Sequence, residues 1–104
     1  MTKVVFYEKD ERLTGFLIKD HSGYDQEGYD IVCASVSSAA YLTANTLTEI
    51  VGAGADIDVR EAYFRFIIKD KFDESENHLK GLKLHLESLA QDYSQYISCK
   101  TETV

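Results

Sequence analysis

Strand-like patterns of apolar and polar residues occupy five short stretches of the chain. These stretches are Lys3–Tyr7, Leu13–Lys19, Asp56–Val59, Ala62–Lys69 and Ile97–Thr103. Within Leu13–Lys19 the side chains of Thr14, Phe16 and Ile18 alternate with Leu13, Gly15 and Leu17, which predicts a strand with both faces partly covered. The polar break at Glu8–Arg12 predicts that the first two stretches form a hairpin.

Two longer stretches show the three- and four-residue spacing of an α-helix. In the first, Asp30 is a favourable N-terminal cap and Gly52 predicts the end of the helix. Its apolar positions are Val32, Val36, Ala39, Ala40, Leu47 and Ile50. The second helix has one apolar stripe, formed by Leu79, Leu82, Leu86, Leu89, Tyr93 and Tyr96. The order ββαββαβ predicts a single α+β domain over residues 1–104, with a mixed sheet of about five strands and two main helices.

Composition and charge narrow the classes of function. With 104 residues and 44% hydrophobic side chains, the chain can form one core without a metal or cofactor, and we expect neither. No apolar run reaches the roughly 18 residues of a membrane span, and the N-terminal segment lacks a secretory signal, so we expect a cytoplasmic protein without membrane contact. The net charge of −7 argues against direct nucleic-acid binding. It favours a basic partner, although acidity commonly serves solubility alone.

The candidate reactive side chains lie mainly in one stretch, DHSGYDQEGYDIVCASVSS, which runs from Asp20 to Ser38. Cys33 falls in the first turn of the predicted helix, where the helix dipole and unpaired N–H groups favour a thiolate. His21 lies at the end of a predicted strand, and the intervening loop permits it to reach the sulfur. Histidine titrates near neutrality, as a base for a cysteine nucleophile should.

Each of these residues also has a structural interpretation. Cys33 can be a small buried hydrophobe, and His21 can be an ordinary exposed loop residue. Asp30 can cap the helix only, or it can also hydrogen-bond His21 and fix its tautomer. Ser37 lies one helical turn after Cys33, where a helix-surface role and a substrate contact are both open.

The loop between His21 and Cys33 contains two glycines and two tyrosines. Gly23 and Gly28 lower the cost of backbone rearrangement, and Tyr24 and Tyr29 can cover an apolar peptide. We therefore expect a substrate loop that closes over a bound hydrophobic segment and assembles the pair.

Other candidate signals favour a structural interpretation. The glycine-rich segment Val51–Asp56 lacks the lysine of a phosphate loop and follows a helix instead of preceding one. His78 and His85 lie two turns apart on the last helix without further ligands, so solvated surface is favoured over a metal site. Cys99 lies in a predicted strand and is expected to be an inert thiol.

The segment GYDIVCASVSS (Gly28–Ser38), with His21 upstream, resembles the ribosomal-processing cysteine proteases of Firmicutes and related bacteria. That family is marked by a histidine, a short glycine-containing loop and a D-I-V-C-A run that ends in a serine. The resemblance covers nearly the whole chain, because the hairpin, the helix through ANTLTEI, the YFRFII strand and the leucine-rich last helix follow the family's order. One departure is Asp20, which stands where the family usually has glycine before the histidine.

The resemblance implies a concrete function. Family members remove a short N-terminal extension from large-subunit ribosomal protein twenty-seven, cutting after a hydrophobic stretch that contains phenylalanine. Cys33 would be the nucleophile and His21 the base, with Asp30 and Ser37 at motif positions of supporting role. The resemblance also implies a homodimer. The alternatives are a non-catalytic ribosome-assembly module that binds the same basic protein, and a redox-sensing thiol protein, which the absence of a nearby resolving cysteine disfavours.

Overall fold

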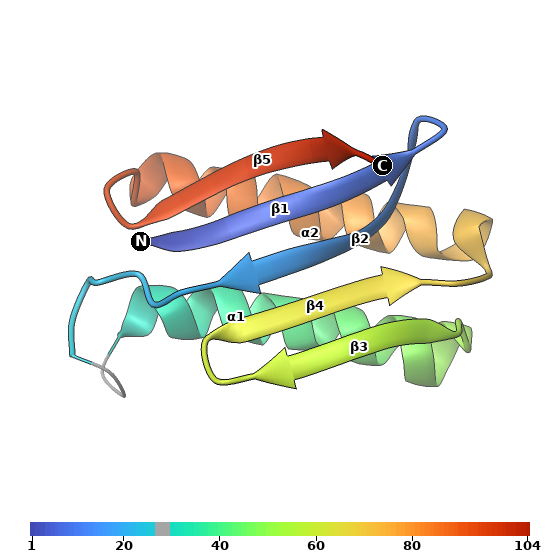
Figure 1. Ribbon diagram of the computed structural model, residues 1–104, viewed down its shortest axis with the longest axis horizontal. Helices are drawn as coiled ribbons and strands as arrows, with labels where there is room; N and C mark the ends of the chain where they lie inside the picture. The colour runs from blue at the N-terminus through green and yellow to red at the C-terminus, as the bar shows by residue number, and fades with distance from the viewer. Residues whose placement is uncertain (27–29) are drawn as a thin grey trace.

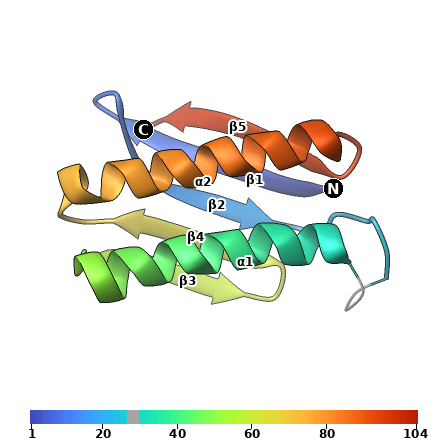
Figure 2. The same cartoon turned by 180° about the vertical axis from the view of Figure 1, so that it is seen from behind.

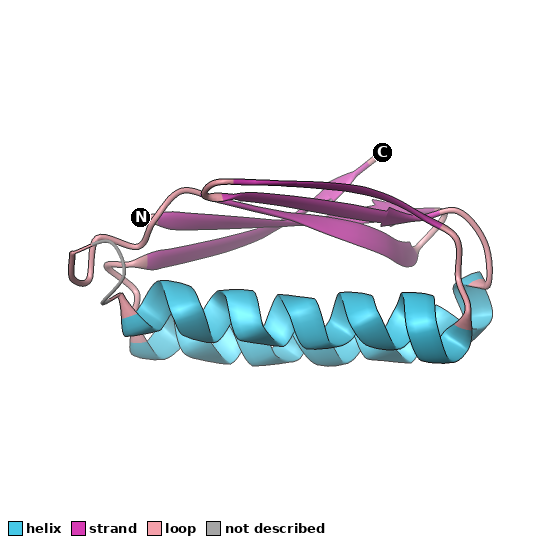
Figure 3. Ribbon diagram, turned by 90° about the horizontal axis from the view of Figure 1, so that it is seen from below, coloured by secondary structure: helices cyan, strands magenta, loops and turns pink. Residues whose placement is uncertain are grey.

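Two helices lie side by side on one face of a five-stranded sheet, and no helix of the described residues covers the opposite face (Figure 1, Figure 3). The computed structural model describes residues 1–26 and 30–104 of the chain. Its elements are β1 (Thr2–Lys9), β2 (Arg12–Lys19), α1 (Ile31–Asn45), the short π-helix η1 (Thr46–Val51), β3 (Ala55–Arg60), β4 (Tyr63–Ile68), α2 (Phe72–Asp92) and β5 (Ile97–Thr103). The predicted fold class and element order are confirmed.

The strands lie in the order β3-β4-β2-β1-β5, and only the β1–β5 pair is parallel. The β1–β2 hairpin turns at Asp10 and Glu11, whose φ angles of 52° and 65° are those of a tight turn with two left-handed residues. The sheet is therefore mixed, as expected, because β5 returns from α2 to pair in parallel with the first strand.

The hydrophobic core lies between the sheet and the helices. Phe16 is fully buried, and its ring centroid lies 5.4 Å from that of Phe66 and 6.5 Å from that of Phe6. Leu47, Leu79 and Leu86 are 0% exposed on the helical side. Figure 2 shows α1 and α2 running in opposite directions across this face. No helix among the described residues is long and apolar enough to cross a membrane.

The predicted apolar stripes depart from the structure near the end of each helix. Ile50 is 80% exposed, because the chain after Asn45 widens into the π-helix and its turns no longer keep the spacing of an α-helix. Gly52 then ends this segment at φ 81°, as predicted. Tyr93 and Tyr96 pack against the core as predicted but lie beyond α2, which ends at Asp92. The chain turns there, because the N–H groups of Tyr96 and Ile97 both donate to the Tyr93 carbonyl.

The N-terminus, several strand ends and a turn meet at one end of the sheet (Figure 1). β1 begins there and β2 ends there, and the first residue of α1 follows the same loop. The β3–β4 turn joins them, since the Asp20 N–H donates to the Ala62 carbonyl at 2.9 Å. This end of the sheet therefore brings together His21 and Cys33.

Two glycines offer a matched test of how closely the sheet is packed. A Cβ on Gly15 in β2 would lie 2.1 Å from the Phe66 carbonyl oxygen of β4, so Gly15→Ala should lower the free energy of unfolding by about 1–3 kcal/mol. A Cβ on the exposed Gly81 of α2 would meet nothing within 4 Å, so Gly81→Ala should raise the free energy of unfolding by about 0.5–1 kcal/mol. Urea titration of both variants measures the difference, and equal shifts would contradict the close β2–β4 contact.

Candidate active site

His21 and Cys33 lie opposite each other at this end of the sheet. The Nδ1 atom of His21 is 3.9 Å from the Cys33 sulfur. His21 is exposed and lies two residues after the end of β2, whereas Cys33 is half-buried in the first turn of α1. Residues twelve positions apart are thus brought to the edge of hydrogen-bond distance, which a small movement of the imidazole would close.

Asp30 joins the end of β2 to the start of α1. Its backbone is extended, at φ −81° and ψ 93°, and its Oδ1 accepts the Cys33 N–H at 2.9 Å, which is the predicted helix cap. The buried hydroxyl of Ser22 lies 2.6 Å and 2.5 Å from the two carboxylate oxygens and donates to them. One carboxylate therefore holds both the residue after His21 and the backbone of Cys33.

The Asp30 carboxyl remains ionised in this setting. Burial by itself raises its pKa, but hydrogen bonds from the Cys33 N–H, the Ser22 hydroxyl and the N–H groups of Gly23 and Ser22 outweigh burial and lower the pKa below its ordinary value. A fixed negative charge consequently lies beside the first turn of α1.

The expectation of a thiolate favoured by position alone is wrong for this conformation. Burial, and next the Asp30 carboxylate, raise the pKa of the Cys33 thiol above its ordinary value. Hydrogen bonds from the Ser37 hydroxyl, the Ser22 N–H and the Thr2 hydroxyl act in the opposite direction. The cap charge that stabilises the helix thus opposes a second negative charge on Cys33.

Asp20 has an unusual backbone conformation that bears on His21. Its φ is 70°, in the left-handed region that glycine adopts most easily. Its carbonyl accepts the Thr2 hydroxyl at 3.0 Å, and its carboxylate lies 3.5 Å from the Lys3 ammonium. The left-handed region is the one that glycine adopts most easily, and here hydrogen bonds hold an aspartate in it.

A cleft of about 200 Å³ opens beside the pair. Its walls come from β2, α1 and the β3–β4 turn, and its lining includes Ser37, Tyr41, Val59, Tyr63 and Phe64 besides His21 and Cys33. Arg60 covers one rim, with its guanidinium carbon 4.1 Å from the centroid of the Tyr63 ring. This mostly apolar and aromatic surface leads directly to the sulfur, as a peptide-binding cleft requires.

Part of the predicted substrate loop lies in the described structure. Gly23 has a φ of 79°, and the Tyr24 ring packs edge-on against Tyr93 and Tyr96, with centroids 5.9 Å and 5.2 Å away. Gly28 and Tyr29 lie outside the described residues. Tyr24 is therefore directed to the end of α2 in this conformation.

Sequence reasoning missed Thr2 and Ser22. Both hydroxyl groups are buried beside the pair, Thr2 at 0% and Ser22 at 2% exposure. Neither belongs to a recognisable motif, because a threonine at a strand start and a serine in a loop are common. Only their contacts with Asp20 and Asp30 single them out.

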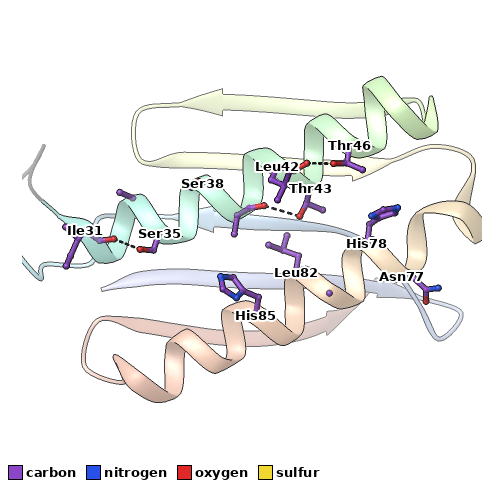
Figure 4. Close-up of a pocket in the computed structure, with 13 residues that line it drawn as sticks. Ile31, Ser35, Ser38, Leu42, Thr43, Thr46, Asn77, His78, Leu82 and His85 are labelled. Carbon is purple, nitrogen blue, oxygen red and sulfur yellow. Dashed lines mark hydrogen bonds between the residues drawn. The ribbon is translucent and has the colours of Figure 1, made fainter.

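The remaining candidates lie elsewhere. His78 and His85 are exposed on α2 and border a hollow of about 940 Å³ between the two helices (Figure 4). The described residues contain no group of three or more side chains suited to hold a metal ion. Cys99 is half-buried, its Sγ donates to the Leu86 carbonyl at 3.6 Å, and burial together with Glu87 raises its pKa to about 11.

Comparison with known proteins places this geometry in context. A family model described as cysteine protease Prp matches residues 1–98. The ribosomal processing cysteine protease Prp of Bacillus subtilis (strain 168) is 22% identical to this chain in an alignment of length 102. The alignment covers 91% of each chain. Two crystal structures of an essential ribosomal processing protease Prp from S. aureus share the fold. The complex with a covalently linked product peptide has a TM-score of 0.91 at 23% identity, and the complex with a substrate peptide has 0.86 at 22% identity. Each match covers 98% of this chain and 100% of the other.

Because Asp30 both caps α1 and places a charge beside Cys33, its substitution should lower the stability of the fold and raise the reactivity of the thiol. Asp30→Asn keeps a capping oxygen but removes the charge, so it should destabilise the fold by about 1–2 kcal/mol and lower the pKa of Cys33. Alkylation of Cys33 by iodoacetamide at neutral pH should then be faster than in the unmodified protein.

The pH of this measurement matters. Because the folded-state pKa of Asp30 is lowered, its stabilising contribution is complete above its unfolded value of about 3.9 and is lost as pH falls through the lower folded value. Rates are therefore compared above pH 6. Slower alkylation and a rate of peptide cleavage reduced by orders of magnitude, in a variant that stays folded, would instead indicate that Asp30 orients His21.

Proposed function

The chain belongs to the cysteine protease Prp family, and from that premise we propose that it removes the N-terminal extension of large-subunit ribosomal protein twenty-seven, with Cys33 as nucleophile and His21 as base. The observation that carries the proposal is the 3.9 Å approach of His21 Nδ1 to the Cys33 sulfur at the mouth of a cleft. The relatives from B. subtilis and S. aureus, described as ribosomal processing proteases, support the class of substrate.

The raised pKa of the thiol favours general-base activation over a preformed ion pair. In the first half of the reaction His21 takes the thiol proton as the sulfur attacks the peptide carbonyl carbon. The tetrahedral intermediate collapses when His21 returns that proton to the leaving amine, which breaks the C–N bond and leaves a thioester on Cys33.

Water completes the cycle. His21 takes one proton from the water as its oxygen attacks the thioester carbonyl, and the C–S bond breaks to release the carboxylic acid, which loses the second proton to solvent. The proton returns to the sulfur, so both residues regain their starting state. Cys33 N–H is occupied by Asp30, so another N–H of the first turn of α1 is needed to stabilise the oxyanion.

The surface charge fits the proposed substrate. The chain carries a net charge of −7, and ribosomal proteins are generally basic, so long-range attraction favours their encounter. An apolar cleft beside the sulfur suits a hydrophobic sequence before the scissile bond. We infer that the reaction takes place in the cytoplasm during ribosome assembly and needs neither metal nor cofactor.

The reaction is tested with the extended ribosomal protein from the same organism and mass spectrometry of the products. The unmodified chain should create one new N-terminus. Cys33→Ala and His21→Ala should each reduce the rate by about a thousandfold or more, since the two residues act as a unit. Cys99→Ala is the matched control and should retain full activity, because that thiol is packed in the sheet.

The binding-module alternative predicts a different result. A folded, unmodified chain that binds the precursor but leaves it intact over hours, with an affinity that Cys33→Ala does not change, would contradict the protease assignment.

We also propose that the protein is a homodimer, as the family resemblance implies. Exposed apolar side chains on the helices, such as Leu42 and Leu84 at 69% each, provide surface for such contact. Light scattering after size exclusion should give twice the 11.8 kDa mass of one chain. A single-chain mass across the micromolar range would refute the dimer.

A further inference from the structure

Thr2 is a polar residue in an unusually enclosed position. It begins β1 between β2 and β5, and its side chain is 0% exposed. Its N–H donates to the Tyr96 carbonyl at 2.8 Å, and its hydroxyl donates to the Asp20 carbonyl at 3.0 Å. A buried hydroxyl is stable only with a hydrogen-bond partner, and the partner here is the peptide group that directly precedes His21.

The same hydroxyl also acts on Cys33. It is one of three groups whose hydrogen bonds favour the ionised sulfur, together with the Ser37 hydroxyl and the Ser22 N–H. A threonine hydroxyl has one proton and two lone pairs, so it cannot donate to the Asp20 carbonyl and to a thiolate at once. In this structure the hydroxyl donates to the Asp20 carbonyl.

We propose that Thr2 is a positioning residue of the His21–Cys33 pair, whose buried hydroxyl holds the peptide group before His21 and so places the imidazole against the sulfur. The proposal rests on the assignment of Cys33 as nucleophile and His21 as base. It assigns a role to the start of β1, which lies outside the His-loop-Cys motif.

The backbone of Asp20 explains why such a support is needed. A non-glycine residue at φ 70° occupies a sparsely populated conformation that persists only when its surroundings hold it. Two hydrogen bonds do so, from the Asp20 N–H to Ala62 and from the Thr2 hydroxyl to the Asp20 carbonyl. Since His21 follows immediately, any change at Asp20 changes the distance between the imidazole and the sulfur.

A purely structural hydroxyl would behave differently, and Thr14 provides the comparison. Thr14 in β2 is also buried, at 8% exposure, and its hydroxyl donates to the Tyr7 carbonyl at 3.4 Å, away from the pair. Thr2→Val and Thr14→Val each remove one buried hydroxyl from the same sheet without a change of size. Both variants should therefore lower the stability of the fold, but only Thr2→Val should change the reactivity of Cys33.

The experiment measures the pH dependence of iodoacetamide alkylation of Cys33 by peptide mass spectrometry, with Cys99 as the internal reference. Thr2→Val should raise the apparent pKa of Cys33 by about one unit and slow its alkylation about tenfold at neutral pH. Thr2→Ser keeps the hydroxyl, so its alkylation rate should stay within about twofold of the unmodified rate. The same is expected of Thr14→Val. The charged and titratable groups around the cleft are His21, Asp30, Lys19, Asp20, Tyr41, Arg60 and Tyr63, and all are unchanged across the series.

Cleavage of the precursor provides the second readout. Thr2→Val should lower kcat about tenfold and leave KM within about twofold, because the hydroxyl acts on the pair and not on the cleft. If Thr2→Val does not fold, Thr2→Ala removes the hydroxyl without new bulk and decides by the same outcomes.

An unchanged alkylation profile in the folded Thr2 variant, or an equal shift in Thr14→Val, would overturn the proposal. His21→Ala separates this failure from that of the proposed function. If His21→Ala cleaves as well as the unmodified chain, the base assignment is wrong. If His21→Ala is inactive while Thr2→Val matches the unmodified chain, only the role of Thr2 fails.

Discussion

The buried carboxylate of Asp30 is the contact on which the rest of this site depends. It accepts the Cys33 N–H at the start of α1 and the hydroxyl of Ser22 at the end of the strand-to-loop connection. Without it, the helix would lose its cap and the segment after β2 would lose its anchor. The approach of His21 to Cys33 is a consequence of this link, since each of the two residues lies next to a group that Asp30 holds.

This arrangement has an electrostatic cost. A helix start ordinarily favours an anion, but the negative charge of Asp30 already occupies that position and raises the pKa of the thiol. Hydrogen bonds from Thr2, Ser37 and the Ser22 N–H compensate in part. The site therefore disfavours the thiolate, and in the proposed mechanism His21 takes the thiol proton during attack. A resting thiol is also less open to oxidation than a thiolate.

The sheet contributes rigidity to a site made largely of loop and helix-start residues. β2 is flanked by β1 and β4 and is held by the Phe16 ring within the core, so the strand that ends just before Asp20 is firmly placed. The β3–β4 turn and the first residues of β1 then contact Asp20 from two sides. The backbone that precedes the exposed His21 is thus held in place. Much of the remaining cleft surface is apolar and aromatic.

Local patterns were sufficient to predict the elements of this fold. Alternation and helical spacing predicted the order ββαββαβ, the Asp30 cap and the Gly52 stop, because these features depend on residues close in the sequence. The same periodicity misplaced Ile50 and the end of the last helix, since a widened turn and a chain reversal change the phase without a composition signal.

The chemistry of the site divides in the same way. The sequence alone determined that a histidine and a helix-start cysteine flank a short loop, and its motif indicated the family that the comparison confirms. The protonation state of Cys33 and the contacts of Thr2 and Ser22 were decided only by the tertiary structure. A pKa depends on burial and on charges brought close in space, and Thr2 meets Asp20 across eighteen positions of the chain, which no local pattern encodes.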